Sequence, residues 1–465
     1  MTQPPPEQPF DQRPTAPPGF GPPPLSPFTA SALKAVPDQA RRGRRRTILT
    51  LVLALLLAAG LGTGGWLLWS GEPAAEPSPQ HRVDARLEWL TPVPDADKDS
   101  MDATATTWFA KGNVIQTTAR AVTAYREDGG KPSWSVPVPG VACGSSPRPD
   151  GGIAAIAYGK QKYHCDQLMA VDLRHGRSLW HKNLADSRGD DQLYQNANIS
   201  VSRGVVTLSG NTRTVAFTAD KGSPVKRRDN GCVPRGDVAS GGQDLSLVQC
   251  DLSGRQFLMR VDPKTGIEKW TWKVLDGVTV HNILSVDPAV VTIGREGESD
   301  VSNIALLDDQ GHLKKMISLT SGPYALGCNH MKLDSCRLAL VAGGSIYLAT
   351  GNDDGVRADT IAAFDAATGE RRWSVRLPGQ RENRPLALHD GRLLVYQEAT
   401  QDESGRVFSL DPSTGGSKLH LKLPTQSAEA EKKIAHNGFA YFRDDHLYLV
   451  AGDGASGNSL LMSYR

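Results

Sequence analysis

The chain has 465 residues, with 52 lysines and arginines against 50 aspartates and glutamates, and a net charge of +2 at pH 7. The first 46 residues hold seven basic and three acidic residues, whereas residues 71–465 hold 45 basic and 47 acidic ones. The larger part thus lacks the concentrated basic charge that phosphate contacts need, so no nucleic-acid partner is expected.

Residues 1–46 are crowded with proline, as in the runs Pro4–Pro6 and Pro22–Pro24, and they end in the basic cluster Arg41–Arg46. Proline has no backbone donor and fixes φ, so such runs support neither a helix nor a sheet ladder. We predict a disordered, partly polyproline II tail on the cytoplasmic side. A docking peptide for a proline-recognition domain is the alternative interpretation of this tail.

The segment Thr47–Trp69 contains no Asp, Glu, Lys or Arg. As a helix it would extend about 34 Å at ~1.5 Å per residue, enough to cross a hydrocarbon core of ~30 Å. The preceding arginines favour a cytoplasmic N-terminus, and Trp66 lies near the far interface. The pattern predicts a transmembrane helix over 47–69, a linker over 70–82 and an extracytoplasmic C-terminal part tethered to the cell membrane. A cleaved signal peptide is the alternative.

The rest of the chain is built on a repeated hairpin-like segment. Its fullest copy is AFDAATGERRW at residues 363–373, and copies with one change lie at 170–180 and 260–270. Poorer copies begin at Ala124, Ala216, Ala305 and Ser409, and successive copies are 44 to 46 residues apart, except for one interval of 57. A period near 45 residues with strand-like alternation is typical of a four-stranded propeller blade. No stretch after Trp69 shows a sustained helical period.

Each recurring residue type has a physical role in this hairpin. The Asp accepts hydrogen bonds from N–H groups of the turn, the Gly supplies a positive φ, and the Trp of the returning strand fills space between stacked sheets. The residues that we assign to these structural roles are Asp172, Gly176, Trp180, Asp262, Gly266, Trp270, Asp365, Gly369, Trp373, Asp411 and Gly415.

The two ends of this region supply an eighth unit. The chain ends in Leu461–Arg465, which resembles the strand before the turn, whereas Leu87–Val93 resembles the strand after it. Pairing these two segments would close a ring and remove a free sheet edge. We therefore predict an all-β, eight-bladed propeller of four-stranded antiparallel blades over residues 83–465. An open solenoid of the same hairpins is the structural alternative.

The six cysteines all follow the predicted membrane span, in a compartment where disulfides form. Each sequential pair falls between two successive hairpins and hence within one predicted blade. We predict the disulfides Cys143–Cys165, Cys232–Cys250 and Cys328–Cys336. No C-x₂-C element indicates a zinc site.

Three further patterns have a structural interpretation that we prefer to a catalytic or metal-binding one. Gly452–Gly457 matches G-x-G-x-x-G, but a strand follows it rather than the helix of a dinucleotide site. Asn352–Gly355 and Asp359 could bind Ca²⁺ through clustered oxygens, yet Asn-Asp-Asp-Gly is also an ordinary β-turn sequence. The histidines show no metal-ligand spacing, and we identify no catalytic or metal-binding residue.

The hairpin A-x-D-x-x-T-G-x-x-x-W resembles the repeat of the pyrroloquinoline-quinone-like (PQQ-like) propeller superfamily over roughly Leu87–Arg465. That superfamily includes quinone-dependent alcohol dehydrogenases and non-catalytic scaffolds such as an outer-membrane assembly lipoprotein. The dehydrogenases typically carry a vicinal disulfide beside the cofactor, and no two cysteines are adjacent here. The resemblance therefore implies neither a bound quinone nor its Ca²⁺. The tail and single anchor look like those of propeller proteins on the surface of high-GC Gram-positive bacteria.

These observations lead to a functional expectation. We expect a membrane-tethered, extracytoplasmic propeller that acts as a non-catalytic binding scaffold for a protein or peptide, because loops around a rigid ring suit capture. A sensor that signals inward through the helix and tail is one alternative. A PQQ-dependent oxidoreductase is the other.

Overall fold

The computed structural model describes one compact unit within Gln80–Arg465. The described residues are 83–94, 106–161, 165–184, 198–210, 213–227, 231–250, 254–320, 322, 324–328, 332–350, 359–435, 438–452 and 459–465. The predicted tail, membrane helix and linker lie outside them. Among the described residues, no helix is long and apolar enough to cross a membrane.

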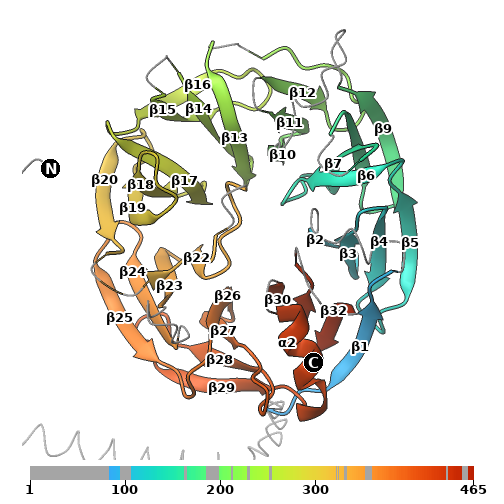
Figure 1. Cartoon of the computed structure of the whole chain (residues 1–465), viewed down its shortest axis with the longest axis vertical. Helices are drawn as coiled ribbons and strands as arrows, with labels where there is room; N and C mark the ends of the chain where they lie inside the picture. The colour runs from blue at the N-terminus through green and yellow to red at the C-terminus, as the bar shows by residue number, and fades with distance from the viewer. Residues whose placement is uncertain are drawn as a thin grey trace, which may run out of the picture. The chain divides into compact units, whose positions relative to one another are not determined.

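The described residues form eight antiparallel sheets arranged around a ring, as Figure 1 shows. We number these blades in chain order. Blades one to four are β2(Thr107–Ala110)–β3(Asn113–Thr117)–β4(Ala121–Arg126)–β5(Pro132–Pro137), β6(Val141–Ser145)–β7(Ile153–Gly159)–β8(Gln167–Asp172)–β9(Arg177–Asn183), β10(Asn198–Ser202)–β11(Val205–Ser209)–β12(Thr214–Thr218), and β13(Val233–Ser240)–β14(Gln243–Gln249)–β15(Gln256–Val261)–β16(Glu268–Lys273).

The second half of the ring continues the same order from the centre outward. Blades five to eight are β17(Val278–Ser285)–β18(Val290–Arg295)–β19(Val301–Leu307)–β20(Leu313–Ser318), β21(Tyr324–Ala325) and β22(Ala339–Ala342) beside β23(Ser345–Thr350)–β24(Thr360–Asp365)–β25(Arg371–Arg376), β26(Asn383–His389)–β27(Arg392–Gln397)–β28(Arg406–Leu410)–β29(Ser417–Lys422), and β30(Phe439–Arg443)–β31(His446–Val450)–β32(Ser459–Tyr464)–β1(Leu87–Pro92).

The ring is closed by the two ends of the propeller. Strand β1 pairs antiparallel with β32, and Trp89 lies opposite Ser463. Backbone hydrogen bonds between Arg86 and Arg465 extend the pairing to the last residue of the chain. The predicted eight-bladed propeller and its closure by terminal strands are therefore confirmed.

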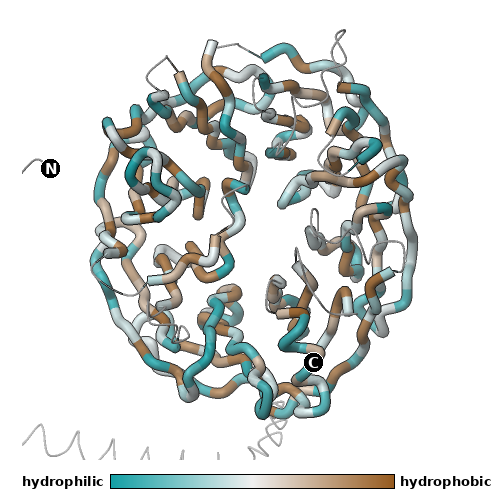
Figure 2. The backbone as a smooth tube through the Cα atoms, in the orientation of Figure 1, coloured by the Kyte–Doolittle hydropathy of each residue, from teal (hydrophilic) through white to brown (hydrophobic). Residues whose placement is uncertain are grey.

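Alternation of side chains along each strand builds the stack of blades. Successive side chains of a strand point to opposite faces of its sheet, and Figure 2 shows hydrophobic residues, in brown, distributed around the whole ring. Each sheet buries both faces against its neighbours, so the middle strands are nearly continuous apolar runs. In β8, for example, four of six residues are buried.

In five blades a tryptophan on the outer strand packs against the turn of the next blade, whereas the outer strands of blades five and seven, β20 and β29, contain no tryptophan. The indole Nε1 of Trp180 donates to the carbonyl of Ala219 at 2.9 Å, and a Cβ placed on Gly222 would lie 2.6 Å from the Trp180 ring. Trp373 makes the same arrangement with Pro412, at 2.8 Å, and with Gly415. Glycine is therefore required at these turns both for its positive φ and for the close approach of the indole.

The aspartate before each turn holds the turn's backbone. The Oδ1 of Asp262 accepts hydrogen bonds from the N–H groups of Lys264 and Thr265, each at 3.0 Å. Asp365 accepts equivalent hydrogen bonds from the backbone N–H groups of Ala367 and Thr368. A side-chain hydrogen bond from Arg372 and these N–H groups lower the pKa of Asp365 to about 2. These contacts stabilise the ionised carboxylate and the turn together.

Three disulfides join the cysteines as predicted: Cys143–Cys165 in blade two, Cys232–Cys250 in blade four and Cys328–Cys336 in blade six. No free cysteine occurs, since all six are paired. Each bridge closes a loop within a single blade, so it shortens the unfolded chain locally and leaves the blade junctions to packing.

Six blades have four strands, as predicted, and two blades deviate from this number among the described residues. Blade three has three strands, and blade six has five because two short segments, β21 and β22, both pair with β23. In blade six the second short strand follows the disulfide-bonded loop, so one inner strand is divided in two.

The propeller also contains one short helix, although no sustained helical pattern follows the predicted membrane segment. A 3₁₀ turn, η3(Thr425–Ser427), leads into the helix α2(Ala428–Ala435) between blades seven and eight. The helix has only eight residues, too few for a sustained period, and it buries Ile434 in the core of these blades. Its Glu431 accepts a hydrogen bond from Gly405 N–H at 2.7 Å, which fixes the helix to blade seven.

Candidate binding groove between the third and fourth blades

In blade three, the described part of the outer segment pairs with β12 only as far as Val225. After the turn, Thr218 N–H donates to Ser223 O and Val225 N–H donates to Ala216 O, each at 2.8 Å. The only strand that pairs with β12 among the described residues is β11. In blade two, by contrast, β9 follows β8 along its whole length. The first half of β12 is therefore a strand edge.

Burial agrees with this open edge. One of the five residues of β12 is buried, and Thr214 at its start is exposed. The equivalent strand of blade two buries four of six residues. The difference follows from the missing cover on the outer side of β12.

The interblade tryptophan is also missing at this junction. Trp180 lies opposite Ala170 in blade two, whereas the residue opposite Ala216 in blade three is Val225, whose N–H donates to Ala216 O. The glycine that would receive an indole is Gly266, in the turn of blade four. It lines a pocket instead.

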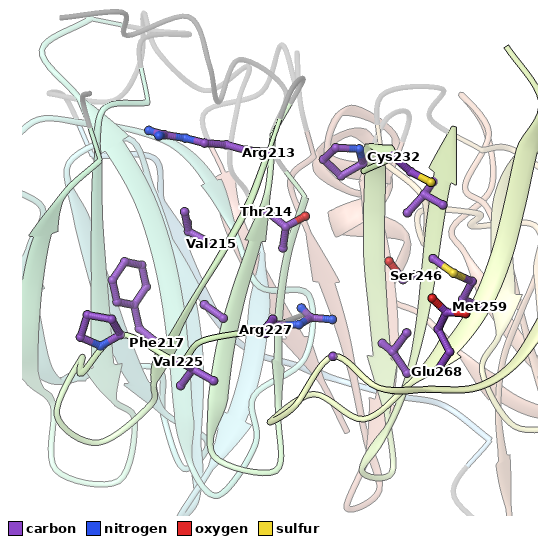
Figure 3. Close-up of a pocket in the computed structure, with 16 residues that line it drawn as sticks. Arg213, Thr214, Val215, Phe217, Val225, Arg227, Cys232, Ser246, Met259 and Glu268 are labelled. Carbon is purple, nitrogen blue, oxygen red and sulfur yellow. The ribbon is translucent and has the colours of Figure 1, made fainter. Parts of the chain in front are cut away.

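This pocket, the groove between blades three and four, has a volume of about 370 Å³ and appears in Figure 3. On the side of blade four, Val248, Met259 and Val261 form a small apolar floor. The lining contains two basic residues, Arg213 and Arg227, and one acidic residue. The full lining is Arg213, Thr214, Val215, Ala216, Phe217, Pro224, Val225, Arg227, Cys232, Pro234, Ser246, Val248, Met259, Val261, Gly266 and Glu268.

The interior of this junction is polar, unlike the others. A hydrophobic cluster spans each of the remaining pairs of adjacent blades, whereas the apolar floor of the groove belongs to blade four alone. The buried polar residues that meet here are Ser200, Ser202, Thr207, Ser209, Asp237, Asp244 and Ser246. Ser209 Oγ donates to Asp237, and Arg227 donates to Thr207 Oγ1 at 3.1 Å. Blades three and four are thus joined by polar contacts rather than by an apolar core.

Asp244 is the most strongly perturbed group of this junction. Burial raises its pKa from 3.8 to about 7, and the nearby carboxylates of Asp237 and Asp262 act in the same direction. Ser202 and Arg227 oppose the shift. Arg227 also lies 4.0 Å from Asp237, so it links the groove with the buried acids behind it. The protonation of Asp244 therefore changes the charge of this junction near neutral pH.

The comparison with protein families identifies the propeller. A family model described as outer membrane protein assembly factor BamB matches residues 84–272 and 339–460. The chain belongs to this family. No curated protein sequence matches the chain. The match bears out the resemblance of the repeated hairpins to the PQQ-like propellers.

Two solved structures illustrate the similarity. BamB from Moraxella catarrhalis is 16% identical, covers 82% of this chain and 97% of its own, and has a TM-score of 0.49. Hsv2 from Kluyveromyces lactis is 12% identical, covers 68% of this chain and 97% of its own, and has a TM-score of 0.41. At these identities the comparison concerns the fold alone.

The centre of this BamB-family ring is occupied rather than open. The loop that follows Cys328 carries Asp334, which lies 3.9 Å from Arg148 of blade two, four blades away around the ring. Leu333 O of the same loop accepts a hydrogen bond from Ile283 N–H at 2.6 Å. The cavity beside Arg148 and Asp334 has a volume of only about 10 Å³. The groove between blades three and four is therefore the better candidate for a binding site.

The residues predicted from the hairpin repeat are distributed around the ring. Most of them lie at separate turns, and only Gly266 and Cys232 line the groove. The sequence analysis missed the groove itself. The copy starting at Ala216 ends in Lys226 instead of tryptophan, but this signal does not single out the groove, because the copies starting at Ala305 and Ser409 also lack the tryptophan. Among the described residues, no three His, Cys, Asp or Glu side chains form a cluster that could hold a metal ion.

Proposed function

We propose that this protein is a membrane-tethered, extracytoplasmic propeller that binds another protein or peptide and does not itself catalyse a reaction. The observation that carries the proposal is the groove between blades three and four of a BamB-family propeller, where the described residues of blade three include neither the second half of the outer strand nor an interblade tryptophan. An open strand edge beside an apolar floor is a surface that recognises polypeptides.

Two sequence features support the membrane and compartment parts of the proposal. The uncharged segment 47–69 follows an arginine cluster, which favours a cytoplasmic tail and an external propeller. All six cysteines form disulfides, which persist in oxidising compartments. None of these bridges joins adjacent cysteines, so the vicinal disulfide of quinone-dependent dehydrogenases is not formed.

Site-specific photo-cross-linking of the full chain in its own cells tests the binding function. A photoreactive amino acid would replace one exposed residue at a time in different blades: Lys131, Lys226, Lys264 or Glu370. We expect a discrete protein adduct from at least one position that is absent from the others. If no position gives a protein adduct, the scaffold function is wrong.

Protease treatment of intact cells tests the topology separately. An external protease should cleave the propeller only after reduction and partial unfolding, and it should leave residues 1–46 protected until the cells are lysed. Protection of the propeller under these conditions, or cleavage of the tail from outside, would contradict the proposed orientation.

A further inference from the structure

We propose that the groove between blades three and four binds an extended segment of a partner polypeptide, which pairs with the open edge of β12 and inserts a tryptophan side chain into the pocket. This inference rests on the proposed binding function and specifies its site and the chemistry of its ligand. It is argued from the backbone of β12, from the pocket, and from the way this ring completes its own blades.

The backbone of β12 has hydrogen-bonding groups that point away from its blade. Thr218 and Ala216 bond outward to Ser223 and Val225, so Thr214, two residues further along, presents its N–H and C=O to the same side. No backbone partner of Thr214 on that side occurs among the described residues. Unpaired groups at a strand edge are the template that an added strand uses.

The pocket has the surroundings of an indole site. At five of the seven other junctions a tryptophan rests on the turn glycine of the next blade: Trp89, Trp134, Trp180, Trp270 and Trp373. Trp180 lies opposite Ala170 in its blade, whereas the smaller Val225 lies opposite Ala216 of β12. At this junction Gly266 and the apolar floor of Val248 and Met259 line a pocket of about 370 Å³. An aromatic side chain gains from burial here and from contact with the methionine sulfur.

The ring already completes one blade with a strand that no hairpin connects to it. Strand β1 comes from the opposite end of the propeller, pairs with β32, and places Trp89 on the turn of blade one, where its Nε1 donates to Glu127 O at 2.9 Å. A free strand of this kind is thus sufficient to complete a three-stranded sheet in this architecture. A partner segment could complete blade three in the same way.

Charge favours one kind of segment. The groove is lined by Arg213 and Arg227 on the side of blade three and by Glu268 on the side of blade four. An acidic residue next to the inserted tryptophan would approach the two guanidinium groups. The sequence of β1 has this arrangement, with Glu88 immediately before Trp89.

The test uses a fluorescent peptide with the sequence of residues 85–93, ARLEWLTPV, and the full chain purified in detergent. Binding is measured by fluorescence anisotropy, with ARLEALTPV as the matched peptide that lacks the indole. We expect saturable binding of the first peptide and at least tenfold weaker binding of the second. Equal binding of the two peptides would overturn the proposal.

Variants of the chain locate the site. Val225→Trp places an indole of the chain itself at the pocket and should weaken peptide binding at least tenfold, whereas Lys226→Trp, at the next residue and outside the pocket lining, should leave it unchanged. Thr214→Pro removes the outward N–H without removing a bond to β11, and it should weaken binding, whereas Thr214→Val should not. Each variant is first compared with the parent chain in thermal unfolding.

The outcomes separate this inference from the scaffold function. If the peptide binds equally to Val225→Trp and the parent chain, it binds elsewhere, for example by replacing β1 in blade eight, and the groove proposal is wrong. If the peptide does not bind at all while photo-cross-links to a protein form at other blades, the scaffold function stands without this groove. A cross-linked partner lost on Val225→Trp supports both.

Discussion

Protonation of Asp244 provides a direct test of the polar junction between blades three and four. Its pKa is raised from 3.8 to about 7, chiefly by burial. Because the folded pKa lies above the unfolded one, the folded chain holds the proton more tightly between these values. The contribution of Asp244 to the free energy of unfolding is therefore greatest below about pH 4, falls as the pH rises towards 7, and stays low above it. At 1.36 kcal/mol per pKa unit, the shift corresponds to about 4 kcal/mol.

Replacement of Asp244 by Asn removes this titration while keeping the size of the side chain. We expect Asp244→Asn to be more stable than the parent chain at pH 8 by up to about 4 kcal/mol, with the difference vanishing towards pH 4. Urea denaturation of both chains from pH 4 to 8, followed by tryptophan fluorescence, measures it. Glu398, whose pKa burial also raises to about 7, titrates in both chains and cancels in the comparison. Parallel pH profiles for the two chains would refute the assignment.

Three further predictions concern the blades themselves. Trp373→Ala should lower the free energy of unfolding by about 3–5 kcal/mol in chemical denaturation, because a large side chain and its hydrogen bond to the next blade are lost. Gly176→Ala should cost more than Gly204→Ala in the same assay: both have positive φ, but a Cβ at Gly176 would meet the ring of Trp134 at 2.3 Å, whereas nothing lies within 4 Å at Gly204. Deletion of Leu87–Pro92 should leave the edge of β32 unpaired and produce aggregation in light scattering, and a monodisperse deletion variant would contradict the closure argument.

The repeat made the ring predictable. A glycine turn after an aspartate, followed at a fixed distance by tryptophan, describes one hairpin completely, because those contacts are local or reach only the adjacent blade. The spacing of successive copies then gave the number of blades, and the unmatched ends gave the closing strand. The disulfides were predicted from the same repeat, because each sequential pair of cysteines lies between two successive hairpins and hence within one blade.

The exceptions could not be obtained in the same way. The helix α2 is too short for a periodic pattern to be recognised, and its position depends on the contact of Glu431 with Gly405, in another element. The loop that crosses the centre is fixed by Asp334 and Arg148, which lie far apart in the chain. Such contacts carry no local signal, because each partner is an ordinary surface-type residue in its own segment.

The sequence by itself determined the ring: which residues turn the chain, which fill the space between sheets, and which terminal segments meet. Only the tertiary structure decided where that ring is incomplete. A valine at position 225 is unremarkable in isolation, and serines and aspartates on neighbouring strands become an interface only when two blades stack. The groove exists because a strand leaves its sheet halfway, and a hydrogen-bonded edge or its loss is a property of paired strands rather than of one sequence.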